Sequence, residues 1–468
     1  MDSLSSAAPG DSITEDVAKF VHAMRFEDIP ANVLQLSKKA ILDSLGLAVA
    51  GAKSEGSAII RRYIQESGCA TGGAPIFGSG LRAAPQFAAL ANGSAMHADD
   101  YDDTYHPSRV HPSAPVIAAV LADAERDGAT GREVLTAFNV GVEVTTKVSQ
   151  AIDGQHYQRG YHATGTCGAF GAAAAVSRLR RLPAVSVCAA LGIAGSTSAG
   201  LRENFGTMVK PLHTGRAAEN GYFSAVLAAL GFTAAPTIFE GARGFFSAGG
   251  GGYDPAIIRG KLGSPWTFAA PGISIKPFPS GALTHPPMSK MQELIIANNI
   301  HPADVERVHV KTNRLLPENL TYHRPVTGLQ GKFSMEFCLA SILVLRQAGL
   351  GEFTDEVVAR PDVQEAIGKI DYGVYSDEEA KSGKYTRLTA FIDIVLKDGR
   401  RISGRADIAK GSPEIPMSDT DVADKFRECA SFAGWPDAHA EEAIALISRL
   451  EDVRDIRSLT SLLARPVA

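Results

Sequence analysis

The sequence predicts a mainly α fold: both chain ends build one large all-helical domain, and a smaller α+β lid domain lies between them in the chain. Three observations predict it. Apolar residues recur at helical spacing up to about residue 265, prolines and a strand-like alternation follow, and helical spacing returns after Ser418. We therefore place the helical domain at residues 1–267 and 411–468, and the α+β lid domain at 268–410.

The first helices are marked by their start signals. Ser12 and Glu15 form a capping-box pattern ahead of an apolar face, and Pro30 stands where a first helical turn begins. Alanine dominates the later segments, and such small residues permit close helix contacts. Helical spacing predicts further helices at about 84–98, 113–126, 131–151, 166–179, 183–199 and 216–231.

The middle of the chain has a different pattern. Six prolines between Pro265 and Pro287 argue against a long helix there. Residues 305–311 alternate as in a strand, and residues 332–347 have helical spacing. Asp398 and Gly399 predict a hairpin turn between strands at 388–396 and 400–408, and helices are expected again from 418 to 463.

Composition excludes several classes of protein. The 468 residues are 45% hydrophobic and 21% charged with a formal charge of −5, which argues against a nucleic-acid-binding surface. No apolar run approaches the roughly 20 residues of a membrane span, and residues 1–10 lack a signal-peptide pattern, so we expect a cytoplasmic protein. The five cysteines are scattered without a CxxC pair, which argues for reduced thiols and against zinc or iron–sulfur sites.

One segment concentrates ionisable residues between two apolar helices. Residues 97–111 contain three histidines and four aspartates. A solvated acidic turn is one interpretation. A magnesium site is a second, because Asp99, Asp100 and Asp103 have an aspartate-rich spacing, although no second ligand motif accompanies them. We favour a third, in which one aspartate orients a histidine or binds substrate while the others cap helices.

Four further side chains are candidates, each with an ordinary structural explanation beside the functional one. His111 precedes a predicted helix, and nearby carboxylates suit it to proton transfer. His162 precedes an Ala-rich helix whose start either receives an anion or is an ordinary glycine-containing helix start. Lys210 and Lys276 each stand next to a proline in apolar surroundings. Surface lysines often stand next to a proline, but the occurrence of two such lysines favours a pair that binds two carboxylates of one substrate.

Six segments together resemble the MmgE/PrpD family, which includes 2-methylcitrate dehydratases, cis-aconitate decarboxylases and iminodisuccinate epimerases. Their order along nearly the whole chain makes the match specific for the family. They are His-x-x-Asp-Tyr-Asp-Asp-Thr at 97–104, His-Pro-Ser at 111–113, Gly-Tyr-His-Ala-Thr-Gly-Thr at 160–166, Lys-Pro-Leu-His-x-Gly-x-Ala-Ala at 210–218, Phe-Glu-Gly-x-x-Gly-Phe at 239–245 and Ile-Lys-Pro-Phe-Pro at 275–279.

The resemblance implies a large helical domain, a smaller α+β lid, a homodimer, and a site with neither a metal nor a nucleotide cofactor. Because Lys210 and Lys276 belong to different predicted domains, we expect the lid to close over substrate. Arg109 lies in a loop of variable length, where it either reaches a substrate carboxylate or points to solvent. The pocket positions implied by the resemblance are Asp100, Thr104, His111, His162, Lys210, Lys276 and Tyr322.

We therefore expect a cofactor-independent lyase acting on a small di- or tricarboxylate, with no nucleic-acid or membrane partner. A 2-methylcitrate dehydratase-like reaction is the first interpretation. A cis-aconitate decarboxylase-like reaction, or epimerisation of an aminopolycarboxylate such as iminodisuccinate, is the alternative; a magnesium-dependent helical enzyme and a non-catalytic scaffold are more distant. We expect His111 to be the general acid or base, oriented by Asp100, with His162 as the third catalytic residue. The expected substrate-binding residues are Thr104, Lys210, Lys276 and Tyr322.

Overall fold

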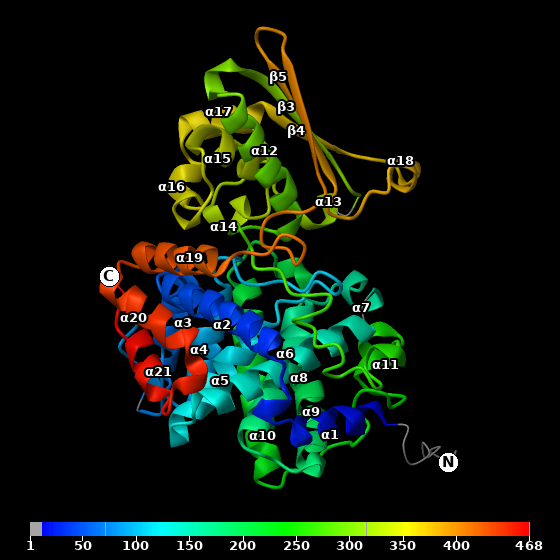
Figure 1. Ribbon diagram of the computed structural model, residues 1–468, viewed down its shortest axis with the longest axis vertical. Coiled ribbons are helices and arrows are strands. Elements are labelled where there is room, and N and C mark those ends of the chain that lie inside the picture. The colour runs from blue at the N-terminus through cyan, green and yellow to red at the C-terminus, as the bar shows by residue number, and fades with distance from the viewer. Residues whose placement is uncertain (1–11, 71, 153, 315, 468) are drawn as a thin grey trace.

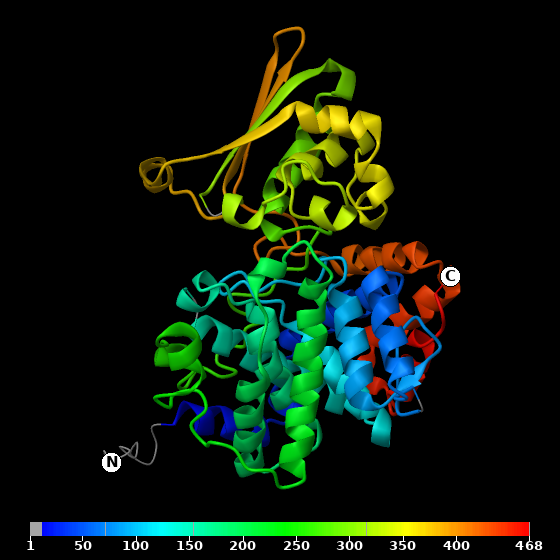
Figure 2. The ribbon, with the colours of Figure 1, turned by 180° about the vertical axis from the view of Figure 1, so that it is seen from behind.

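The computed structural model describes residues 12–70, 72–152, 154–314 and 316–467, which form two lobes stacked along the long axis (Figures 1 and 2). The larger lobe is helical and contains both ends of the described chain. The smaller, which we call the α+β lobe, combines a sheet with helices and is formed by residues 278–406. The fold is mainly α, as predicted.

The helical lobe is built around closely packed, Ala-rich helices. Its helices are α1 Ile13–Ala23, α2 Ala31–Gly51, α3 Glu55–Glu66, α4 Pro85–His97, α5 Ser113–Asp127, α6 Gly131–Ile152, α7 Gln155–Gln158, α8 Ala163–Leu179, α9 Ala184–Thr197, α10 Val209–Ala229 and α11 Phe245–Gly250. α8 packs against α6 and α10, and α10 also packs against α4. Glycine permits the closest approach: a Cβ added at Gly171 would lie 1.7 Å from Thr145 Oγ1.

The C-terminal helices return to the helical lobe. They are α19 Asp419–Phe432, α20 Asp437–Ser448 and α21 Arg457–Leu463. α19 lies against α2 (Figure 1), and one hydrophobic core contains Leu45 of α2 together with Phe426 of α19. Apolar burial therefore joins the two ends of the chain.

The α+β lobe has its own hydrophobic core and a four-stranded sheet of order β4-β3-β5-β6. Its strands are β3 Val305–Thr312, β4 Ile370–Val374, β5 Ala390–Leu396 and β6 Arg401–Ala406; a separate pair, β1 Ala74–Pro75 and β2 Arg82–Ala83, lies in the helical lobe. β3 is parallel to β4 and antiparallel to β5. The helices of this lobe are α12 His285–Ala297, α13 Leu316–Asn319, α14 Gly328–Gly331, α15 Met335–Leu345, α16 Asp355–Val358, α17 Pro361–Gly368 and α18 Asp377–Ser382.

Most predicted elements are present, and the differences have local causes. α10 begins at Val209 rather than 216, because Pro211 occupies its first turn, where a missing N–H costs little. α12 begins where prolines predict a break, since Pro286 and Pro287 also lie in a first turn. α3 and β4 were not predicted; in β4, Gly373 interrupts the strand pattern. The domain boundaries at 268 and 410 stay predictions.

One structural feature bears on the cellular location of the protein. Among the described residues, no helix combines the length and apolar character that a bilayer crossing requires. Residues 1–10, from which we expect no signal peptide, lie outside the described residues. A cytoplasmic location stays a prediction.

Candidate active site

Four helix ends place candidate side chains around one space. His97 is the last residue of α4, and His162 is the N-cap of α8. Lys210 is the second residue of α10, and His111 stands two residues before α5. Three of these positions are helix starts, where unpaired N–H groups and the helix dipole favour an anion.

The first group, which we call the lysine side, consists of Asp100, Lys210 and Lys276, all buried. Lys210 Nζ donates to Asp100 Oδ1 at 2.5 Å; Lys276 Nζ donates to the same oxygen at 2.8 Å and to the Asp100 carbonyl at 2.7 Å. Burial alone would raise the pKa of Asp100, but the two ammonium groups outweigh it and hold that pKa well below its usual range. One carboxylate thus faces two cations, which leaves positive charge for a ligand.

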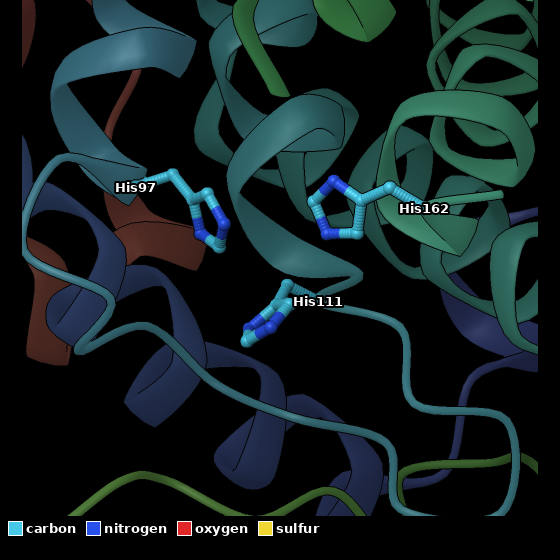
Figure 3. A group of neighbouring side chains, drawn as sticks. All are labelled: His97, His111 and His162. Atoms are coloured by element: carbon cyan, nitrogen blue, oxygen red, sulfur yellow. The ribbon is translucent and has the colours of Figure 1, made fainter. Parts of the chain in front are cut away.

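The second group, the imidazole side, consists of His97, His111 and His162, whose rings face one another (Figure 3). The ring centroid of His97 lies 4.6 Å from that of His111 and 5.8 Å from that of His162. Burial lowers the pKa of His97 to about 4 and that of His162 well below its usual range. These two rings are therefore neutral at pH 7. Their Nε2 atoms have no hydrogen-bond partner among the described residues.

His111 has a defined tautomer. Its Nδ1 lies 2.8 Å from the Asp103 carbonyl, so Nδ1 carries a proton and donates it to that oxygen. Nε2, 4.0 Å from Asp100 Oδ1, is then the nitrogen that exchanges a proton. Asp102 Oδ1 lies 2.7 Å from His97 Nδ1 and 3.4 Å from His111 Nδ1. A carboxylate so placed stabilises His111 when its ring is protonated.

The aspartates therefore differ from their predicted roles. The sequence predicts that Asp100 orients His111, but the structure gives that contact to the Asp103 carbonyl, with Asp102 nearby, while Asp100 binds both lysines. Asp100 adopts a left-handed φ of 49°, which changes the direction of the backbone at this point. Residue spacing does not reveal such a conformation.

The magnesium alternative requires three aspartates that the structure keeps apart. Asp99 accepts from Lys332 Nζ at 2.9 Å, Asp100 binds the two lysines, and Asp103 accepts from the Ser113 hydroxyl. Among the described residues, two sets bring potential metal ligands within 4.8 Å of one another: His97, His111 and His162, and His97, Asp100, Asp102 and His111. Histidine-rich sets suit transition metals rather than magnesium.

A cavity lined by residues of both lobes joins the two sides. Its volume of about 110 Å³ favours a small ligand, since pockets that bind drug-sized ligands measure roughly 300–1,000 Å³. Among the described lining residues, Lys210, Lys276, Arg109 and Arg387 are cationic and Asp100 is the carboxylate. Such an excess of positive charge suits a small polyanion. The α+β lobe contributes Gly281, Ala282, Leu283, Leu320, Phe333, Arg387 and Leu388.

The other two predicted substrate-binding residues differ in position. Thr104 lines the cavity, and its Oγ1 lies 3.4 Å from His111 Nδ1. Tyr322 is not a lining residue. Its hydroxyl donates to the carbonyl of Phe205 at 3.4 Å, and Phe205 does line the cavity. Tyr322 therefore contacts a lining residue and not the cavity itself, and its role in substrate binding stays a prediction.

Sequence reasoning missed several residues of the site. Arg387 precedes β5 and donates to the carbonyl of His106, 281 residues away in the chain. Phe205 and Phe333 lie near Lys210, with ring centroids 5.1 and 5.2 Å from its ammonium nitrogen. No spacing pattern links these positions, because they meet only when the two lobes pack together.

Comparison with known proteins finds similarity over nearly the whole chain. The model of the MmgE/PrpD N-terminal domain matches residues 15–257, and that of the MmgE/PrpD C-terminal domain matches residues 278–452. The chain is 30% identical to a cis-aconitate decarboxylase of Homo sapiens, with 97% of this chain and 95% of the relative covered. It is 28% identical to a cis-aconitate decarboxylase of Aspergillus terreus, with 97% and 96% covered.

Proposed function

The chain belongs to the MmgE/PrpD family, and on this basis we propose that it is a lyase that decarboxylates cis-aconitate or a closely similar tricarboxylate. The relatives that align with nearly its whole length are cis-aconitate decarboxylases. One observation carries the proposal: two buried lysines share Asp100 on one side of a small cavity, and His111 Nε2 is available for proton transfer on the other. Carboxylate binding and proton delivery are thus combined in one place.

The chemistry follows from these positions. Lys210 and Lys276 bind carboxylates of the substrate, since ammonium groups stabilise negative charge that develops nearby. The carbon–carbon bond to one carboxylate breaks and carbon dioxide leaves. The bonding electron pair stays on the substrate as a carbanion delocalised over the adjacent double bond. His111 then gives a proton from Nε2 to carbon, which completes itaconate, and the ring regains its proton from solvent.

The proposal is tested by product analysis. Purified, chelator-treated protein is incubated separately with cis-aconitate, 2-methylcitrate, citrate and iminodisuccinate, and the products are identified by NMR. We expect itaconate and carbon dioxide from cis-aconitate. The Lys38→Met variant controls for the general effect of replacing a buried lysine, because Lys38 binds Ser448 and Glu451 and is not among the residues that line the cavity.

The other possible results either identify a different activity or contradict the proposal. An alkene from 2-methylcitrate without itaconate from cis-aconitate identifies a hydro-lyase. Inversion of iminodisuccinate without a change in mass identifies an epimerase. Turnover of none of the four compounds by folded protein contradicts the proposed substrate class.

Dehydration of 2-methylcitrate is the second candidate, and one observation favours it. Dehydration needs one group to remove a proton and another to protonate the leaving hydroxyl, whereas decarboxylation needs the protonation step alone. His162 lines the cavity beside His111, their ring centroids 6.3 Å apart, so a second imidazole is in place. If His162 serves dehydration, His162→Gln abolishes alkene formation and leaves decarboxylation largely intact.

A further inference from the structure

A buried ammonium group lies behind the lysine side, outside the cavity lining. Lys425 of α19 donates from Nζ to the carbonyl of Tyr101 at 2.8 Å and to the carbonyl of Lys276 at 3.0 Å. The same nitrogen lies 2.6 Å from Asp43 Oδ1 of α2 and 3.7 Å from the centroid of the Tyr101 ring. Lys425 is 5% exposed and Asp43 2% exposed.

The two carbonyls belong to the backbone segments that carry Asp100 and Lys276, two of the three residues of the lysine side. Tyr101 directly follows Asp100, and Lys276 contributes its own ammonium group to the Asp100 carboxylate. One cation therefore holds both backbone segments whose side chains must meet. Burying a lysine is costly unless it is fully paired, and Lys425 is paired with Asp43 and with both carbonyls.

We propose that Lys425 is a positioning residue, which sets the distance between Asp100 and Lys276 by binding the backbone carbonyls of Tyr101 and Lys276. This inference rests on the proposed function for its kinetic readout. Lys425 does not touch substrate, because it is not among the residues that line the cavity. It acts through the lysine side, where misplacement by about 1 Å costs on the order of 100-fold in rate.

The chain offers a matched control on α2, the helix that carries Asp43, the carboxylate partner of Lys425. Lys38 of α2 is 6% exposed, donates to the Ser448 carbonyl at 2.8 Å and pairs with Glu451 at 2.8 Å. Like Lys425, it is a buried lysine whose ammonium group binds backbone carbonyl oxygen and a carboxylate. It contacts neither Asp100 nor Lys276 among the described residues.

The experiment compares Lys425→Met with Lys38→Met. We expect both variants to lower the melting temperature, but only Lys425→Met to lower kcat, by about 10–100-fold with KM changed less than about threefold. Lys425→Gln, which keeps an amide donor for one carbonyl, is expected to lose less kcat and serves if the methionine variant does not fold. A wild-type kcat in a folded Lys425 variant, or an equal loss of kcat in Lys38→Met, overturns the proposal.

A second readout separates this inference from the proposed function. Hydrogen–deuterium exchange of residues 98–106 and 273–278 is expected to quicken in Lys425→Met and not in Lys38→Met. If the wild-type protein does not turn over cis-aconitate, the proposed function fails while exchange still decides the positioning role. Equal exchange in the two variants overturns that role even when the wild type is active.

Discussion

The lysine side and the imidazole side of the cavity bury ionisable groups in opposite ways. On the lysine side the charges are kept, because Asp100 accepts from both Lys210 and Lys276. On the imidazole side charge is suppressed: burial lowers the pKa of His97 to about 4 and lowers that of His162 well below its usual range. Paired cationic side chains suit binding of a polyanion, and imidazole is the side chain suited to taking up and releasing a proton near neutral pH.

The largest expected effect tests whether proton transfer belongs to the imidazole side. His111→Gln removes Nε2 as a proton donor but keeps a side chain that can donate to the Asp103 carbonyl. We expect kcat to fall by about 10²–10⁴-fold with little change in KM. Steady-state kinetics measures kcat and KM separately, and His301→Gln, at an exposed histidine, is the control. A kcat near that of the wild type would remove His111 from the mechanism.

The next prediction concerns the loss of folding stability in acid, which we expect to arise from the imidazole side. An unfolded histidine binds a proton below about pH 6.5, whereas His97 in the folded protein binds one only below about pH 4. In this window the unfolded state holds more protons, so stability falls as pH falls from about 6.5 to 4. The expected loss for His97 alone is about 3 kcal/mol of unfolding free energy.

His97→Gln checks this sign. Denaturant unfolding between pH 4 and 7 should have a shallower pH dependence in His97→Gln than in the wild type. In the wild type, His97 and His111 outweigh the burial of Asp102 and hold its pKa well below the usual value, so the contribution of Asp102 is lost only at lower pH. An unchanged slope in His97→Gln would mean that acid sensitivity arises elsewhere.

A smaller effect tests whether binding belongs to the lysine side. Lys210→Met removes one of the two cations on Asp100 and, under the proposed function, a charge-assisted hydrogen bond to a substrate carboxylate. Such a bond contributes about 1.5–3 kcal/mol, so kcat/KM should fall about 10–100-fold, mainly through KM. Lys147→Met, a buried lysine that is not a lining residue, is the matched control. A fall confined to kcat would instead give Lys210 a role in the chemical step.

Local chemistry made much of the fold predictable. Capping and apolar spacing located α1, and Asp398 with Gly399 located the hairpin between β5 and β6. Prolines were the main source of error, because the same residue breaks a helix interior and favours a first turn. Pro211 and Pro286 lie in first turns, so α10 starts earlier than expected and α12 was not predicted.

The sequence predicts which residues line the site but not which of them contact one another. His111, Lys210 and Lys276 stand out by residue type and line the cavity. Their pairing was not predictable, since Lys210 and Asp100 are 110 residues apart and the φ of 49° at Asp100 decides where its carboxylate points. Residues of the α+β lobe such as Arg387 join the site only through the packing of the two lobes.

The smallest expected effect is that of metal removal, which should leave both sides unchanged. A metal on the three imidazoles would have to compete for His97 Nδ1, bound to Asp102 at 2.7 Å, or use the Nε2 atoms of His97 and His162, which have no hydrogen-bond partner among the described residues. Lys210 lowers the pKa of both His97 and His162 by charge repulsion, after burial, and a divalent cation would meet the same repulsion. We expect dialysis against a chelator to change kcat less than about twofold. At a catalytic metal site, even mutation of the residues that support the metal ligands typically costs about 10–100-fold in affinity or activity. If the chelator abolishes activity and a transition metal restores it, the imidazole side binds a metal rather than transferring a proton.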